Sequence, residues 1–215
     1  MNIILLGPPG IGKGTQAIML SEKLGIPKIT TGDIMREEAK NGTELGKKVE
    51  DYMNRGELVP DRTVIKIMSK RLSSKDCKKG FVLDGFPRTL VQAGGLEKIT
   101  KIDLVLNLSA PKKDLIERMA GRLTCRSCGS IYHRKYSPPK KPNVCDACGG
   151  GLYRREDQKE SIIKKRLEVY ERQTKPLTEY YKKRGLLKNI NAEGTKEEVA
   201  KTVGKVIKNF MVKSK

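Results

Sequence analysis

The sequence contains no tryptophan, and aromatic residues make up only 5% of its 215 residues. Proteins that grip nucleic acid commonly stack bases on aromatic side chains, so this scarcity argues against a specific groove for DNA or RNA. Long apolar runs are also missing, and none reaches the ~20 residues that a membrane-spanning helix needs. The first apolar run, residues 3–6, is too short for an export signal. We therefore expect a cytoplasmic protein without a membrane partner.

Acidic residues are scarce relative to basic ones. The 25 Asp and Glu stand against 45 Lys and Arg, which gives a formal net charge of +20. Such a field attracts nucleotides, nucleic acids and acidic membrane surfaces alike, so the charge alone does not choose among them. The hydrophobic content of 37% and charged content of 33% fit a soluble protein with a sizeable core. The length predicts one main domain with insertions.

A glycine-rich segment at residues 7–15 (GPPGIGKGT) follows the first apolar run and precedes a predicted helix. This order is what a phosphate-binding loop requires, because glycines let backbone N–H groups wrap around an anion and the helix adds its positive dipole end. We expect Lys13 to bind the outer phosphates and Thr15 to lie near a magnesium nucleotide. Gly14 separates the lysine from the hydroxyl residue, which indicates a particular branch of phosphate-loop proteins.

Short apolar runs alternate with helical patterns, which predicts an α/β fold with three layers around a central five-stranded parallel sheet. Strands are expected at 3–6, 26–29, 81–84, 104–108 and 186–190. Helices are expected at 16–24, 34–41, 44–55, 61–72 and 114–120, and again from 157 and from 194 onward. The helical stretch at 30–59 is longer than a simple crossover needs, so we interpret it as a substrate flap.

Asp84 ends an apolar run, FVLD, and is followed by GFPRT. In open parallel sheets the ligand site lies at the carboxyl ends of the strands, so Asp84 should lie beside the phosphate loop. A carboxylate there can hold water on Mg²⁺. The alternative is an aspartate that only stabilises a turn, because Asp-Gly after a strand is a common turn sequence.

Four of the five cysteines form two Cys-x2-Cys pairs separated by sixteen residues: Cys125, Cys128, Cys145 and Cys148. This spacing predicts a structural zinc site in which four thiolates close a tetrahedron. Zinc would be the main reason that this segment folds, since the segment has little core of its own. An iron–sulfur centre, redox pairs or free thiols are the alternatives. Because four cysteines complete a ligand set, we expect His133 to be a surface or packing residue.

Three motifs together resemble the adenylate kinase family: GPPGIGKGT at 7–15, TTGD at 30–33, and DGFPRT at 84–89 with Gln92. The cysteine-bearing segment resembles the zinc-containing lid of the long form of that enzyme. The resemblance implies reversible phosphoryl transfer from Mg·ATP to AMP, giving two ADP, in the homeostasis of cellular adenine nucleotides. It also implies a monomer with Mg²⁺ and structural Zn²⁺ as cofactors and ATP, AMP and ADP as its small-molecule partners.

The resemblance further implies three structural parts. Residues 1–29, 60–120 and 158–215 would form the core domain. Residues 30–59 would form the AMP-binding domain, called the flap below. Residues 121–157 would form the zinc-binding domain over ATP, called the lid below.

The resemblance also implies which residues hold the substrates. For ATP they are Gly10, Ile11, Gly12, Lys13, Gly14, Thr15, Arg118 and Arg122. For AMP they are Thr31, Arg36, Glu57, Leu58, Val59, Gly85, Arg88, Gln92, Arg154 and Arg166. Arg36 and Arg88 would bind the phosphate of AMP, and Gln92 would bind the edge of the adenine.

Catalysis, by the same resemblance, would use Lys13, Asp84, Arg88, Arg122, Arg154 and Arg166. Arginines suit phosphoryl transfer because each offers a planar, permanently charged fork to phosphate oxygens. An arginine on the transferred group can raise the rate by about 10³–10⁵. Asp84, with Asp33 as a second candidate, would organise Mg²⁺ and its waters. Each arginine could instead be a surface cation on a chain this basic.

Three other functions have to be weighed. A nucleoside monophosphate kinase acting on UMP, CMP or GMP would use the same phosphate chemistry, but Gln92 and the long lid argue against it. A nucleic-acid-binding protein would use basic residues near the cysteines, such as Arg126 and Arg134, but the low aromatic content argues against it. A structural zinc protein would not need Lys13 and Asp84.

Overall fold

The computed structural model describes residues 1–213, and residues 214–215 of the expected core domain lie outside the described part. Its centre is a five-stranded parallel sheet in the order β2–β3–β1–β4–β8. The strands are β1 (Asn2–Leu6), β2 (Lys28–Thr30), β3 (Phe81–Asp84), β4 (Leu104–Ser109) and β8 (Leu187–Asn191). The predicted fold class is confirmed. β2 begins later than expected, after Pro27, which has no backbone N–H to donate to a neighbouring strand.

Alternate residues of β1 face opposite sides of the sheet. Ile3 and Leu5 share a core cluster with residues of α1 (Lys13–Leu24), α6 (Lys112–Ala120), α7 (Glu160–Val169) and α9 (Lys196–Lys213). Ile4 and Leu6 share a second cluster with residues of α4 (Asp61–Leu72), α5 (Leu90–Glu97) and α8 (Leu177–Lys183). Each face of the sheet is therefore covered by an apolar layer of helices, as a three-layer α/β fold requires.

The flap consists mainly of two helices, α2 (Thr31–Lys40) and α3 (Glu44–Asn54). Thr43 caps α3, because its hydroxyl accepts a hydrogen bond of 3.0 Å from the backbone N–H of Gly46. The same glycine lets the two helices approach closely, since a Cβ on Gly46 would lie 2.4 Å from the carbonyl oxygen of Glu38. Met35 and Val49 join the second core cluster, so the flap is packed onto the core.

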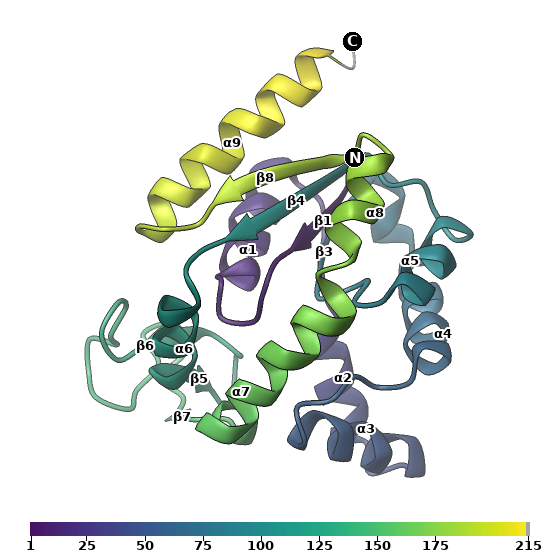
Figure 1. Ribbon diagram of the computed structural model, residues 1–215. Coiled ribbons are helices and arrows are strands. Elements are labelled where there is room, and N and C mark those ends of the chain that lie inside the picture. Colours follow the sequence, from purple (N-terminus) through teal and green to yellow (C-terminus); the bar gives the residue numbers. More distant parts are fainter. Residues whose placement is uncertain (214–215) are drawn as a thin grey trace.

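The lid is a small antiparallel sheet in the order β6–β5–β7, with strands β5 (Arg122–Cys125), β6 (Ile131–His133) and β7 (Leu152–Tyr153). The chain leaves the lid through a 3₁₀ turn, η2 (Glu156–Gln158), and enters α7. Figure 1 shows the lid and the flap helices at the lower end of the view, on either side of α7.

Two of the connections outside the lid contain short helical segments. A 3₁₀ segment, η1 (Lys75–Lys79), precedes β3, and a π-helical segment, η3 (Tyr170–Thr174), links α7 to α8. Within residues 1–213, no helix is long and apolar enough to cross a membrane.

Candidate active site

The loop between β1 and α1 turns at three glycines, Gly7, Gly10 and Gly12, whose φ angles are 137°, 86° and 101°. Two of them also lie against neighbouring backbone. A Cβ on Gly7 would be 2.5 Å from the carbonyl oxygen of Leu108, and one on Gly10 would be 2.8 Å from that of Leu115. The loop is thus fixed between β4 and α6 at the start of α1, which is the geometry of an anion-binding helix N-terminus.

Lys13 is the first residue of α1, and its side chain turns back into the loop. Its ammonium donates hydrogen bonds of 2.7 Å to the carbonyl of Gly7 and 2.9 Å to that of Pro8. Burial lowers the pKa of Lys13 to about 8, and the nearby Asp84 carboxylate partly offsets this effect. Arg88, Arg166 and Arg122 lower the Lys13 pKa further, so several cations surround one point next to the loop.

Asp84 lies where the sequence predicts it, beside the phosphate loop. It is the last residue of β3 and pairs with Leu5 in the sheet. One carboxylate oxygen of Asp84 lies 3.3 Å from the place that a Cβ on Gly14 would occupy. Asp84 is 8% exposed, so a buried negative charge stands among the cations at the carboxyl edge of the sheet.

A pocket opens between the flap and the core. Its lining includes seven of the residues expected to bind AMP: Thr31, Glu57, Leu58, Val59, Gly85, Arg88 and Gln92. Met35, Met53 and Val64 supply apolar walls, and Gly32 completes the lining. Apolar walls with a few converging polar groups are typical of a small-molecule site. Arg36, Arg154 and Arg166 are not among the lining residues.

Arg88 is held by the loop that follows β3. Its Nε donates a hydrogen bond of 2.8 Å to the carbonyl of Gly85, and Thr174 donates one of 2.8 Å to the Arg88 carbonyl. Gly85 has a φ of 83°, and a Cβ there would lie 2.9 Å from the Arg88 guanidinium. The glycine therefore leaves room for the guanidinium. Burial lowers the pKa of Arg88, and Asp84 opposes the shift.

A second group of arginines gathers on Asp157 at the exit of the lid. Arg166 Nη1 lies 2.8 Å from one Asp157 carboxylate oxygen, and Arg155 Nε lies 3.3 Å from the other. Burial raises the pKa of Asp157, but Arg166, Arg155, Arg36 and Arg122 together outweigh burial and lower it. Asp157 therefore stays ionised and holds two guanidinium groups in place.

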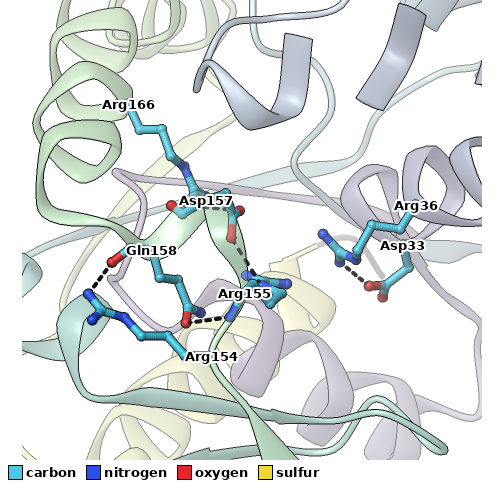
Figure 2. Close-up of polar contacts among 7 residues, drawn as sticks. All are labelled: Asp33, Arg36, Arg154, Arg155, Asp157, Gln158 and Arg166. Atoms are coloured by element: carbon cyan, nitrogen blue, oxygen red, sulfur yellow. Dashed lines mark hydrogen bonds and ion pairs between the residues drawn. The ribbon is translucent and has the colours of Figure 1, made fainter. Parts of the chain in front are cut away.

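Arg155 and Arg154 are adjacent in the sequence but make different contacts, and only Arg155 forms an ion pair with Asp157. Figure 2 shows Arg155 reaching toward Asp157, while Arg154 lies beside the main chain of η2. Arg154 is exposed and donates its hydrogen bond to the carbonyl of Gln158, whereas the Arg155 side chain is only 11% exposed. The sequence RRED offers two adjacent arginines, and only the pairing with Asp157 distinguishes them. The motifs in the sequence single out neither Arg155 nor Asp157.

Arg36 approaches the same group from the flap. It forms an ion pair with Asp33 one helical turn away, and Figure 2 shows the pair facing Arg155 across a gap. Arg36 is close enough to lower the pKa values of both Arg88 and Arg155. Asp33 also lies 3.8 Å from Lys28 at the start of β2, so its carboxylate is engaged in ion pairs with both the flap and the core.

Arg118 and Arg122 flank the hinge between α6 and the lid. Arg118 Nη1 donates a hydrogen bond of 3.1 Å to the carbonyl of Ala192. Burial lowers the pKa of Arg122 to about 10, with Arg155 and Arg166 adding to the effect. Arg122 therefore belongs to the group of mutually repelling cations, which would be stabilised by an anion placed between them.

The four lid cysteines form a compact cluster in which all four sulfur atoms lie within 4.8 Å of one another. Cys125 and Cys148 have sulfurs 3.5 Å apart, and Cys128 and Cys145 have sulfurs 3.6 Å apart. A tetrahedral Zn²⁺ with bonds of ~2.3 Å would place its sulfurs about 3.8 Å apart, so the cluster fits structural zinc.

The Tyr132 hydroxyl lies 3.5 Å from the Cys145 sulfur and lowers the pKa of that thiol to about 6. This shift favours the metal-binding thiolate at Cys145. At Cys148 the Gly150 backbone also favours the thiolate, but the Cys128 and Cys125 thiols outweigh it and raise the Cys148 pKa to about 12. Tyr132 in β6 thus supports the cysteine cluster without being a metal ligand itself.

Comparison with known proteins gives one consistent result. Residues 5–186 match the family model described as adenylate kinase. The chain is 57% identical to the adenylate kinase of Caldicellulosiruptor saccharolyticus, an alignment covering 97% of this chain and 98% of the relative. It is 53% identical to that of Archaeoglobus fulgidus, over 92% of each chain, and 52% identical to that of Methanosarcina barkeri, over 98% of this chain and 100% of the relative.

Proposed function

This chain belongs to the adenylate kinase family and has adenylate kinase activity, and from this premise we propose which residues convert Mg·ATP and AMP into two ADP. The proposed core consists of residues 1–29, 60–120 and 158–215. The proposed flap consists of residues 30–59 and the proposed lid of residues 121–157. The separate lid sheet and the two flap helices support this division.

The ATP side of the site uses the phosphate loop. Backbone N–H groups of residues 10–15 surround the outer phosphates, and Lys13 turns its ammonium from the loop carbonyls to those phosphates. Arg122 and Arg118 reach ATP from the lid hinge. Arg122 begins the first strand of the lid, so closing the lid would bring its charge to the nucleotide and exclude water.

The AMP side uses the pocket between flap and core. Arg88 and Arg36 bind the phosphate of AMP, and Thr31, Gly85 and Gln92 lie around the nucleoside together with the segment from Glu57 to Val59. This arrangement is supported by the lining of the pocket, which combines polar groups with methionine and valine side chains.

In the transfer step an oxygen of the AMP phosphate attacks the γ-phosphorus of ATP, and the bond from that phosphorus to the β–γ bridging oxygen breaks. The protein positions the two anions in line and neutralises the developing charge. Arg166 and Arg155, held by Asp157, contact the transferred phosphoryl group, so Arg155 takes the role expected of Arg154. Lys13, Arg88 and Arg122 complete the set.

Two metal ions have different roles. Mg²⁺ bound with ATP would lie near Thr15 and Asp84, where it neutralises phosphate charge. The buried Asp84 carboxylate beside Gly14 of the phosphate loop supports this location. Zn²⁺ bound by the four cysteines is structural, because four thiolates leave no position open for a substrate.

We also propose that the protein acts as a monomer. Its large exposed hydrophobic side chains, such as Ile18, Leu90 and Tyr136, are spread over separate elements of the described chain. Size-exclusion chromatography with light scattering tests this, and a dimer mass at micromolar concentration would refute it.

The observation that carries the site assignment is the pocket between flap and core that Arg88 and Gln92 line, together with a phosphate loop that holds the Lys13 ammonium. The test is ADP formation from Mg·ATP with AMP, GMP, CMP or UMP, in the wild type and in Arg88→Ala. We expect rapid turnover with AMP only, and a loss of at least about 10²-fold in kcat/KM in the variant. An undiminished rate in Arg88→Ala would overturn the assignment.

A further inference from the structure

The side-chain amide of Gln92 is held at both ends by groups that accept only one orientation. Its Oε1 accepts a hydrogen bond of 2.8 Å from the backbone N–H of Arg88. Its Nε2 donates a hydrogen bond of 2.8 Å to Oδ1 of Asp61. A backbone N–H can only donate and a carboxylate can only accept. If the amide were turned over, donor would face donor and acceptor would face acceptor.

Asp61 is itself fixed. It is the first residue of α4 and directly follows the segment Leu58–Pro60 that leaves the flap. The same oxygen that binds Gln92 also accepts a hydrogen bond of 2.9 Å from the Thr89 hydroxyl. Thr89 in turn caps α5, because its hydroxyl accepts a hydrogen bond of 3.1 Å from the backbone N–H of Gln92. A closed set of hydrogen bonds therefore joins the starts of α4 and α5 and leaves the Gln92 amide little freedom.

The locked amide still has one hydrogen on Nε2 and one lone pair on Oε1. Gln92 is 1% exposed and lines the pocket between flap and core. A base in the pocket would therefore meet one hydrogen-bond donor, the Nε2 hydrogen, and one acceptor, the Oε1 lone pair, whose positions are fixed. Neighbouring Val59 and Val64 offer the base apolar contacts.

This fixed arrangement of donor and acceptor is complementary to one class of purine. A 6-aminopurine presents an acceptor at N1 and a donor at its 6-amino group, which fit the free Nε2 hydrogen and the free Oε1 lone pair. A 6-oxopurine presents a donor at N1 and an acceptor at O6, and it would fit only if the amide turned over. If the amide turned over, the backbone N–H of Arg88 and the Oδ1 of Asp61 would both lose their hydrogen bonds to Gln92, which is strongly disfavoured.

We propose that Asp61 is a specificity-determining positioning residue, which fixes the Gln92 amide so that the pocket selects 6-aminopurine over 6-oxopurine monophosphates. Asp61 acts through Gln92 and need not touch the substrate. The inference rests on the proposed role of Gln92 at the base of AMP, and it adds the residue that decides which way Gln92 faces.

The test compares kcat/KM for AMP and for IMP, with saturating Mg·ATP, in the wild type, Asp61→Ala, Asp61→Asn and Gln92→Ala. IMP is the right competitor because it changes the N1 and C6 pattern without adding a 2-amino group. The AMP-to-IMP ratio is independent of the folded fraction, since both substrates are measured on one preparation. If Asp61→Ala does not fold, Asp61→Glu replaces it, because the longer side chain moves the oxygen away from Gln92.

In Asp61→Ala we expect the AMP-to-IMP ratio to fall about tenfold, mainly through KM for the monophosphate, with KM for ATP unchanged. Asp61→Asn keeps an acceptor oxygen and should stay within about threefold of the wild-type ratio. An unchanged ratio in Asp61→Ala, while Gln92→Ala lowers it, would overturn the inference and leave the proposed function intact. An unchanged ratio in Gln92→Ala would instead refute the base contact of Gln92, and both proposals about this pocket would fall together.

Discussion

The flap and the lid are both inserted between elements of the same core, but they are held in different ways. The flap contributes Met35, Val49 and Val59 to a core cluster that it shares with the sheet and with α4. The lid has its own small cluster, Leu123, Cys125, Cys145 and Leu152, with Tyr132 packed against it. Half of the buried members of that cluster are cysteines.

This difference shows what each insertion needs in order to fold. Burial of apolar side chains stabilises the flap as part of the core. The lid has only a small apolar cluster of its own, so the proposed zinc site would replace a hydrophobic core there. The flap should therefore depend on packing and the lid on zinc.

The two insertions meet at the arginines around Asp157. Arg155 and Asp157 come from the end of the lid, Arg36 comes from the flap, and Arg166 comes from α7. Gly56 at the end of the flap packs on α7, where a Cβ would lie 3.0 Å from Arg166. The charges that we propose for catalysis therefore come from regions with different sources of stability.

The largest expected effect comes from the residue that joins the two regions. Arg155→Ala should lower kcat by about 10³-fold, because the transferred phosphoryl group loses a charged partner. Arg154→Ala is the matched control, and since Arg154 is exposed its kcat should change by no more than about twofold. Steady-state ADP formation measures both. Equal losses in the two variants would contradict the placement of Arg155.

The second prediction compares a cysteine of the proposed zinc cluster with Cys77, which lies outside it. Cys145→Ser should abolish stoichiometric zinc binding and remove stabilisation of the lid on the order of 10 kcal/mol, because three thiolates no longer close the site. Atomic absorption and limited proteolysis within residues 121–157 measure this. Cys77 lies outside the cluster, in η1, so Cys77→Ser should keep its zinc. A full equivalent of bound zinc in Cys145→Ser would contradict the conclusion that the four cysteines hold a metal that stabilises the lid.

The third effect tests the flap. Val49→Ala removes two methyl groups from a side chain that is 0% exposed, which should cost about 2 kcal/mol of unfolding free energy and raise KM for AMP. Leu45 lies on the same helix but is 40% exposed, so Leu45→Ala should cost less than about 0.5 kcal/mol. Chemical denaturation and steady-state kinetics check both variants. A change in zinc content in Val49→Ala would argue that the two insertions are not independent.

The smallest effect is a pH dependence of the lid hinge. His133 Nδ1 accepts hydrogen bonds of 3.0 Å from Lys135 N–H and 3.1 Å from Tyr136 N–H, and Nε2 lies 3.3 Å from the Glu117 carbonyl. Burial lowers the pKa of His133 below its usual 6.5; Arg122 and Arg118 add to this shift, and the Glu117 contact opposes it.

The neutral ring is therefore favoured in the folded state. Its contribution to stability is complete above about pH 6.5 and is lost as the pH falls through the folded-state pKa. Melting temperatures measured from pH 7.5 to 5 check this against His133→Gln, which leaves the chain without histidine. An identical pH slope in the two proteins would show that the imidazole does not contribute.

Local patterns predict much of this structure. The phosphate loop, the position of Asp84, the five strands and the cysteine cluster each depend on a short segment whose spacing decides its geometry. The sequence does not single out Arg155, because its ion pair with Asp157 depends on how η2 turns, and the role of Arg154 stays a prediction. Asp61 was missed because its partners, Thr89 and Gln92, lie 28 and 31 residues away and meet it only in the packed fold.

The most direct test of the account is amide hydrogen exchange of the whole chain, followed by mass spectrometry with and without a zinc chelator. We predict that peptides from residues 121–157 lose protection when zinc is removed, while peptides from residues 30–59 keep theirs. Loss of protection in both regions, or in neither, would contradict the conclusion that metal stabilises the lid and core packing stabilises the flap.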